Sequence, residues 1–484
     1  MSTKLLKKLA VGASLFAMSL TAVGGATAND ITPDDVIKQI QDQYQQTASI
    51  AQRLWDLAEV GYQETESSAL LQKTLADAGF KINAGVADIP TAFVAEYGSG
   101  GPIIGILAEF DALPGITQDA TPVRKLIPTK AAGHACGHNL FGAGSTHAAL
   151  ALAKWLEETG TPGRVRLYGT PAEEGGSGKV YMVRAGLFDD VDTVIHWHAG
   201  DSNSAGAWTT LANRSAKFRF YGTSAHAAGA PDKARSSLDA VESMNYMVNM
   251  MREHVPMETR IHYVITEGGN APNVTPDFAE VFYYLRHPNA MTVDSLWTRL
   301  EDAAKGAAMG TGTEVKWEII HGNHAVVVNE TLQKVMQEKL TKVGGVEYNA
   351  EEQKFAETIY ESLNSPRLKL GSEKEIMPYS TGLGFGSTDV ADVSIAVPTV
   401  GLRTATYVPG TAGHSWQAVA AAGTSIGYKG ANNAAQAMTL MGIELFTNKD
   451  LRDAARKEFM DRRGPNFKYF SLLGDREPPL DYRK

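Results

Sequence analysis

The sequence predicts an α/β protein with a mostly parallel sheet and a smaller βαββαβ domain inserted into it. Short apolar runs without polar alternation occur at residues 103–108, 165–168 and 191–195, as in strands that are covered on both faces. A helical segment separates the first two runs, which is the order expected of a parallel sheet. Beyond residue 213 the pattern changes to a second set of strands and helices.

The composition is that of a large folded protein. The chain has 484 residues, of which 43% are hydrophobic and 20% charged, and it has one cysteine. These proportions exclude a disordered, collagen-like or disulfide-rich chain and predict roughly two to three domains. The formal net charge is −9 and long basic runs are absent, so nucleic acid is not an expected partner.

The first 28 residues have the pattern of a secretory signal peptide. Three lysines precede a mostly apolar stretch at 9–25, and an Ala-x-Ala site follows at 26–28. The apolar stretch is shorter than the ~20 residues that a membrane span needs, and Gly and Ser interrupt it. We therefore expect cleavage after Ala28, export to the periplasm or the medium, and a mature form that does not contact a membrane.

The larger domain is predicted in two parts, at 29–213 and 328–445. Residues 31–78 contain few helix breakers and predict helix, and a helix rich in small residues is expected at 140–156 between the first two apolar strands. Ligands of such sheets bind beyond the carboxyl ends of the strands. Side chains that follow the strands are therefore the first candidates for a functional site.

The inserted domain is predicted at 214–327. Its strands are expected at 216–221, 261–265, 280–286 and 315–319, and its helices at 236–254 and 294–308. The order βαββαβ is that of a ferredoxin-like unit. Residues 446–484 are charged and contain two adjacent prolines, which predicts a tail laid over the surface.

The candidate site begins at residues 134–139, HACGHN. Cys136 and His138 are two positions apart, so both side chains can reach one metal ion, and thiolate and imidazole suit zinc and other divalent ions. In an exported protein a single cysteine has no intramolecular disulfide partner. The alternative interpretation of Cys136 is a small buried hydrophobic residue.

Further candidate ligands lie where predicted strands end. Glu173 and Glu174 come soon after the strand at 165–168, where one carboxylate could bind a metal ion and the other could activate water. His198 follows the next strand, and His414 lies in a loop rich in small residues. The alternative interpretation of the two glutamates is an ordinary solvated acidic pair.

Several motifs occur in a fixed order along the chain. They are AEFDALPG at 108–115, GHACGHN at 133–139, PAEEGGSGK at 171–179, GTSAHAA at 222–228, APNVTPD at 271–277, STDVADVS at 387–394 and GHSWQ at 413–417. This order resembles that of the M20 metallopeptidases, in particular their amidohydrolase branch and the aminobenzoyl-glutamate hydrolase subunits within it. The resemblance implies a di-metal hydrolase domain with an inserted lid and dimerisation domain.

The resemblance also implies a role for each matching residue. Two divalent metal ions per subunit, zinc or manganese, would be held by Cys136, His138, Glu174, His198 and His414. Glu173 would act as the general base, and Asp111 would orient the site. His226 would reach the active site of a second subunit and stabilise the oxyanion, while Asn273 and Arg286 would contact substrate. Our alternative for Arg286 is a surface ion pair on the sheet.

The implied function is hydrolysis of the amide bond of a small N-acyl amino acid by a homodimer. Glu109 and Asn139 depart from the pattern of many relatives in the branch, which agrees with the aminobenzoyl-glutamate group and weakens the transfer of an aminoacylase substrate preference. His134 and His196 are expected to pack or to support the ligands. Two alternatives remain: a dipeptidase or carboxypeptidase of the same family, and an exported metal- or solute-binding protein without catalysis.

Overall fold

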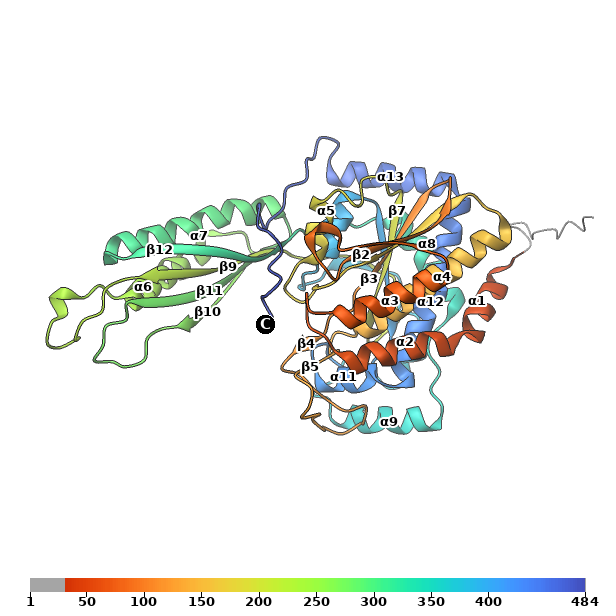
Figure 1. Cartoon of the computed structure of the whole chain (residues 1–484), viewed down its shortest axis with the longest axis horizontal. Coiled ribbons are helices and arrows are strands. Elements are labelled where there is room, and N and C mark those ends of the chain that lie inside the picture. The colour runs from red at the N-terminus through yellow and green to blue at the C-terminus, as the bar shows by residue number, and fades with distance from the viewer. Residues whose placement is uncertain (1–30, 484) are drawn as a thin grey trace, which may run out of the picture.

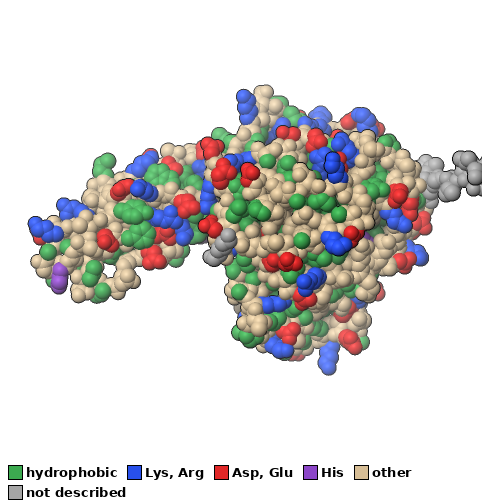
Figure 2. All heavy atoms as spheres, viewed as in Figure 1, with side chains coloured by type: hydrophobic (Ala, Val, Ile, Leu, Met, Phe, Trp, Pro, Cys, Tyr) green, Lys and Arg blue, Asp and Glu red, His purple; other side chains and the backbone are tan. Residues whose placement is uncertain are grey.

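The computed structural model describes residues 31–483, and Figure 1 shows a large α/β domain from which a slender inserted domain projects. The predicted signal peptide lies outside the described residues. Within 31–483, each helix falls short of the length or the apolar character that crossing a bilayer requires. On the face shown in Figure 2, acidic and basic side chains are interspersed over both domains.

The large domain is built on a six-stranded sheet in the order β1-β2-β6-β3-β7-β14. β2 runs opposite to the other five strands, so the predicted mostly parallel sheet is confirmed. All of β3 is buried, which explains its continuous apolar sequence. The strands are β1 (Lys81–Ala84), β2 (Phe93–Ser99), β3 (Ile103–Ala108), β6 (Gly163–Gly169), β7 (Thr193–Gly200) and β14 (Thr399–Ala405).

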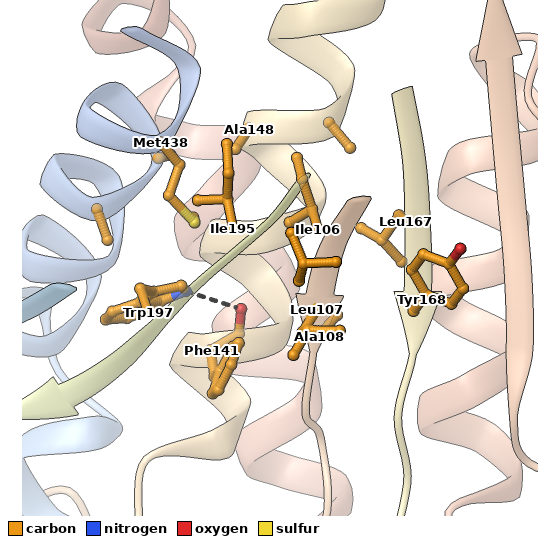
Figure 3. Packing of buried hydrophobic residues seen from close by; sticks show 14 of the residues in the cluster. Ile106, Leu107, Ala108, Phe141, Ala148, Leu167, Tyr168, Ile195, Trp197 and Met438 are labelled. Carbon is orange, nitrogen blue, oxygen red and sulfur yellow. Dashed lines mark hydrogen bonds between the residues drawn. The ribbon is translucent and has the colours of Figure 1, made fainter. Parts of the chain in front are cut away.

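Two long helices, α4 (His138–Thr159) and α12 (Ser425–Thr447), pack side by side against this sheet. Figure 3 shows part of the core between them and the strands, with Trp197 and Ile195 of β7 near Met438 of α12. The Trp197 indole nitrogen donates to the Phe141 carbonyl of α4 at 3.2 Å. This bond satisfies a buried donor and fixes the end of β7 against the start of α4.

The predicted helical stretch 31–78 is three helices, α1 (Pro33–Asp42), α2 (Tyr44–Leu57) and α3 (Thr65–Asp77). The chain leaves the helical path at Ala58, whose φ is 44°, and at Tyr62, whose φ is 63°. These left-handed residues turn the segment 58–64 toward the edge of the sheet where the functional residues lie.

Shorter elements complete the large domain. They are the helices α5 (Gly178–Arg184), α8 (Glu330–Val343), α9 (Ala350–Glu361), α10 (Val390–Ala396), α11 (Trp416–Ala422) and α13 (Lys449–Arg463), and the strand pairs β4 (Leu113–Pro114) with β5 (Ala132–Gly133) and β8 (Ala207–Thr209) with β13 (Thr381–Leu383). Short 3-10 turns lie at Val86–Asp88 and Ser372–Lys374 in this domain, and at Pro231–Lys233 and Arg252–His254 in the inserted domain.

The inserted domain has the predicted βαββαβ order. Its elements are β9 (Ala212–Tyr221), α6 (Ser237–Met251), β10 (Arg260–Glu267), β11 (Phe278–His287), α7 (Ala290–Thr311) and β12 (Glu314–Asn323). The sheet order is β10-β11-β9-β12, with every neighbour antiparallel. The two helices cover one face of this sheet over a second hydrophobic core. The predicted boundary between residues 213 and 214 falls inside β9.

The structure corrects two expectations about element ends. β7 continues to Gly200, so His196 and His198 lie within the strand and do not follow it. The predicted tail at 446–484 is helical over α13, because Ala455 and Phe459 form a buried apolar stripe. After α13, residues 464–483 lack helix and strand, and they run back across the junction of the two domains (Figure 1).

Candidate active site

The predicted ligands converge at the carboxyl-terminal edge of the sheet, from the loop after β6, the last part of β7, the start of α4 and the loop before α11. Their side chains form two groups whose ligand atoms all lie within 4.8 Å of one another. The groups are Cys136, His138 and His198, and Cys136, Glu174 and His414. Cys136 belongs to both groups, so its thiolate would be shared if each group held a cation.

Distances within the two groups suit ligands that face a common centre. Cys136 Sγ lies 3.4 Å from His198 Nε2, and His414 Nε2 lies 3.2 Å from Glu174 Oε1. The His138 side chain is buried, whereas that of His414 is 57% exposed. The site therefore opens to solvent on the side of His414.

Two backbone features bring these ligands together. Gly137 has a φ of 77°, and a Cβ there would lie 2.5 Å from the Tyr407 hydroxyl and from the Ala199 side chain. Only glycine therefore lets Cys136 and His138 point into one site. His414 is also left-handed, with a φ of 59°, and its N–H donates to the Ala135 carbonyl at 2.9 Å.

Asp111 connects two of the ligands. Its Oδ1 lies 2.9 Å from His138 Nδ1, and its Oδ2 accepts the backbone N–H of Glu174 at 2.9 Å. Burial raises the pKa of Asp111, but the neighbouring His138 outweighs it and holds the pKa below its usual value. The carboxylate thereby fixes the ring of His138 and leaves Nε2 for another contact.

The residues present fit divalent metal ions. His138 Nε2 and Glu174 Oε1 are buried and form no hydrogen bond of good geometry, but they lie 3.0 Å from Glu109 Oε2 and 3.2 Å from His414 Nε2. A cation between these side chains would satisfy both atoms. Burial opposes ionisation of Cys136, yet the adjacent His138 and His198 hold the pKa of its thiol well below the ordinary value. A thiolate, imidazoles and a carboxylate form a donor set that suits zinc.

Glu173 is partly buried beside this donor set and lies outside the two groups that share Cys136. It forms a third group with Glu109 and His138, whose ligand atoms also lie within 4.8 Å of one another. Burial and the neighbouring Glu109 and Glu174 raise its pKa well above the ordinary value. Such an environment makes a carboxylate a better proton acceptor than a solvated one. The interpretation of Glu173 and Glu174 as a solvated acidic pair is therefore wrong.

Sequence reasoning missed a buried ion cluster next to Glu173. Lys179 Nζ lies 2.6 Å from Glu109 Oε1 and 2.8 Å from Asp389 Oδ1, and all three side chains are at most 1% exposed. Glu109 Oε2 in turn lies 3.0 Å from His138 Nε2. Lys179 ends the motif PAEEGGSGK, and Asp389 stands in STDVADVS. Their place in these motifs is the sequence signal that could have identified them as part of the site.

The inserted domain carries the three remaining predicted residues. His226 and Asn273 lie in exposed loops that meet through the backbone, and neither joins the ligand groups within this chain. Arg286 lies on β11 and stacks on Tyr284, with 5.2 Å between its guanidinium carbon and the ring centroid. Within residues 31–483 it forms no ion pair, so the expected alternative of a surface ion pair is not observed.

His134 is buried, His196 is partly buried, and neither belongs to a ligand group. His134 Nε2 lies 3.0 Å from the Leu54 carbonyl, and its Nδ1 accepts the Asn139 N–H at 3.2 Å. Burial lowers the pKa of both histidines to about 3, so their rings are neutral. His196 packs against Gly401, where a Cβ would lie 2.2 Å from its Nε2.

Known proteins resemble this chain over most of its length. The profile of the family described as "Peptidase family M20/M25/M40" matches residues 105–366. The chain is 38% identical over 456 residues to a p-aminobenzoyl-glutamate hydrolase subunit of Escherichia coli (strain K12), a match that covers 88% of this chain and 93% of that protein. It is 28% identical over 441 residues to the Xaa-Arg dipeptidase of Mus musculus, with coverage of 87% and 90%.

The fold has a solved counterpart. The structure of a dinuclear metal binding peptidase from Bacillus subtilis matches with a TM-score of 0.58 at 16% sequence identity, over 84% of this chain and 99% of that chain. Together, the fold, the site and these matches define a hydrolase of the amidase and peptidase class. The chain belongs to peptidase family M20, as its motifs predicted.

Proposed function

We propose that this protein hydrolyses the amide bond of an N-acyl amino acid, with aminobenzoyl-glutamate or a related aryl or acyl conjugate as the substrate class. The observation that carries the proposal is Glu173, a partly buried carboxylate that lies beside the two groups that share Cys136 but outside them. A protein that only stores metal has no use for such a group. The substrate class follows the name of the Escherichia coli relative.

Two divalent ions, zinc or manganese, held by the five ligands would lower the pKa of a water molecule and polarise the scissile carbonyl. Glu173 takes a proton from the attacking water and later gives it to the leaving nitrogen. Its raised pKa suits both steps, because the group must hold the proton between them. Asp111 keeps His138 and the backbone of Glu174 in place throughout.

The inserted domain would supply the remaining contacts. Arg286, which lacks an ion pair within residues 31–483, would bind the substrate carboxylate through its planar fork, with Asn273 as a further contact. His226 from a second copy of the chain would stabilise the oxyanion, a contribution of about 2.7 to 4 kcal/mol for one well-placed donor. The inserted domain would thus act as lid and dimerisation domain. Because the Escherichia coli relative is named as a subunit, a different chain is the alternative partner.

Dipeptide hydrolysis is the second candidate. The match to the Xaa-Arg dipeptidase over most of the chain favours it. Both activities would use the same ligands and the same base, and they would differ in the pocket for the acyl half. A substrate panel separates them.

The test is turnover by the metal-loaded protein, comparing wild type with Glu173→Gln. We expect hydrolysis of at least one N-acyl amino acid in a panel of aminobenzoyl-glutamate, hippurate and dipeptides. The substitution keeps the shape of the side chain and removes the base, so kcat should fall by about 10²-fold to 10⁴-fold while both metals stay bound. Glu157→Gln, an exposed position on α4, is the matched control.

Unchanged kcat in Glu173→Gln would contradict the assigned base. A folded, two-metal wild type that turns over only the dipeptides would favour the second candidate, and one that turns over nothing would favour a binding protein.

We also propose that the protein is exported, on the strength of the signal-like pattern at 1–28. Sequencing the amino terminus of the protein recovered from the periplasm or medium should give Asn29 as the first residue. Recovery of the full-length chain from the cytoplasm alone would contradict the proposal.

A further inference from the structure

The loop that carries Glu173 and Glu174 has a backbone that its surroundings must hold in place. Ala172 and Ser177 bracket the loop with φ values of 58° and 59°, a region that costs non-glycine residues about 1 to 3 kcal/mol each. Such a loop keeps its conformation only if contacts with its surroundings outweigh this strain. Three of these contacts come from residues close to the active site in the large domain.

These three contacts reach the loop from two segments. The Tyr62 hydroxyl donates to the Gly176 carbonyl at 2.6 Å, and Glu64 Oε1 accepts the Ala172 N–H at 2.8 Å. Asp111 Oδ2 holds the N–H of Glu174. The carbonyl of Glu174 is left to a different part of the chain.

The end of the C-terminal segment binds that carbonyl. The Tyr482 hydroxyl donates to the Glu174 carbonyl at 3.1 Å, and Arg483 donates to the same oxygen at 2.8 Å. The Tyr482 ring packs edge-on against Tyr62, with 5.5 Å between the ring centroids. A Cβ at Gly61 would lie 2.2 Å from the Tyr482 hydroxyl, so the segment 58–64 is shaped to receive this side chain.

The same segment is anchored on the inserted domain. Leu472 belongs to the core of that domain, and its carbonyl accepts from Arg214 of β9 at 2.8 Å. Arg476 donates to Glu318 and to the Ile320 carbonyl of β12, both at 2.8 Å. Residues 464–483 therefore pass from the inserted domain to the active-site loop, as the dark blue trace near the label C shows in Figure 1.

Contacts along the way keep the segment extended against the large domain. The Glu477 carbonyl accepts from the Tyr181 hydroxyl at 3.2 Å, and the Leu480 carbonyl accepts from the Gln63 side chain at 2.7 Å. These bonds hold the segment in place between Arg476, which binds the inserted domain, and the contact with Glu174.

We propose that residues 464–483 form a strap that positions the loop 171–177, with Tyr482 and Arg483 as positioning residues for the carboxylates of Glu173 and Glu174. The inference rests on the proposed function for the role of the two carboxylates. A shift of the Glu174 peptide moves both side chains, and a displacement of about 1 Å in a reacting group can cost 10²-fold in rate.

The test compares a chain that ends at Asp481, the variants Tyr482→Phe and Arg483→Ala, and the control Asp481→Ala, an exposed neighbour. Four quantities are measured: kcat and KM on the best substrate, zinc affinity by competition with a chromophoric chelator, and amide hydrogen exchange in residues 171–177. The shortened chain should lose about tenfold to 10²-fold in kcat with KM nearly unchanged. Its zinc affinity should fall by about tenfold or more, and exchange in the loop should accelerate.

The two point variants keep the test valid if the shortened chain does not fold. Each removes one of two donors to the same oxygen, so each should show a smaller effect in the same direction. Arg483→Lys should restore kcat, because one ammonium hydrogen can replace the single guanidinium bond. Asp481→Ala should match wild type in every quantity.

Unchanged zinc affinity and loop exchange in the shortened chain and in both point variants would overturn the strap. A wild type without turnover on any substrate would overturn the proposed function alone, because zinc affinity and amide exchange need no substrate.

Discussion

Lys179 carries a positive charge into a site with no access to solvent. Burial lowers the pKa of an ammonium group, but Asp389 and Glu109 outweigh it and hold the pKa of Lys179 above its ordinary value. The charged side chain compensates two carboxylates that would otherwise repel each other beside the catalytic base. The charge of Lys179 therefore allows a third carboxylate, that of Glu173, to lie beside Glu109 and Asp389.

The substitution Lys179→Met should destabilise the fold. It leaves the buried Glu109 and Asp389 without their cation, and breaking a buried ion pair costs about 3 to 5 kcal/mol. Urea unfolding would measure the loss. Lys73→Met is the control, since its pair with Asp77 is largely exposed and is worth at most about 1 kcal/mol. Equal midpoints for the two variants would contradict the assignment.

His147 of α4 predicts how stability depends on pH. Burial lowers its pKa to about 4, and the neutral ring lies between the Thr47 hydroxyl at 2.5 Å and Gln43 Oε1 at 3.3 Å. As pH falls below about 6.5, His147 binds a proton in the unfolded chain but stays neutral in the folded chain. Folding stability should therefore fall between pH 6.5 and 4, by up to about 3 kcal/mol from this group.

Urea unfolding at pH 7 and pH 5 checks this expectation. His147→Gln keeps a polar side chain but cannot titrate, so its stability should depend less on pH than that of wild type. His254→Gln, at an exposed position, should behave as wild type. The expectation fails if His147→Gln and wild type lose the same stability between the two pH values.

At the scale of elements, α4 shows why a helix can be rich in glycine and alanine. A Cβ on Gly144 would lie 2.9 Å from the Ala431 carbonyl of α12 and 3.0 Å from the Trp197 ring. The small residues therefore let α4 approach both α12 and the sheet closely. This approach places Cys136 and His138 at the end of β7.

Gly144→Ala should lower the free energy of unfolding by about 1 to 3 kcal/mol through overpacking. Gly310→Ala is the control, because a Cβ at that position in α7 meets open space. There the alanine should stabilise by about 0.4 to 1 kcal/mol, since it restricts the unfolded chain. If alanine stabilised the protein at both positions in urea unfolding, α4 would have space for a Cβ at Gly144, and the expected overpacking would be contradicted.

The elements also show where sequence reasoning succeeds. The apolar run at 103–108 coincides with β3, and the strand and helix order of the inserted domain is as predicted. Both signals are local periodicities of burial. The breaks at Ala58 and Tyr62 were missed, because left-handed alanine and tyrosine leave no such signal and depend on the tertiary contacts around them.

At the scale of the molecule, the predicted second subunit can be tested by complementation. If His226 acts on the partner's site, Glu173→Gln and His226→Ala should each lack activity alone. Mixed dimers would contain one site with an intact base and an intact His226, so mixing should restore turnover. Light scattering checks that both variants keep the mass of the wild-type assembly. Two inactive variants that fail to complement after exchange of subunits would contradict a shared site.

The sequence by itself determined the fold class and the family, and it predicted a set of ligands. Burial periodicity and short motifs such as HACGHN are local properties, so they can be seen without coordinates. The tertiary structure decided which side chains meet. Lys179 pairs with Asp389 across 210 positions, and Arg483 reaches the Glu174 carbonyl across 309. Contacts between residues so distant in the chain depend on how the elements pack, and that information is not contained in any local pattern.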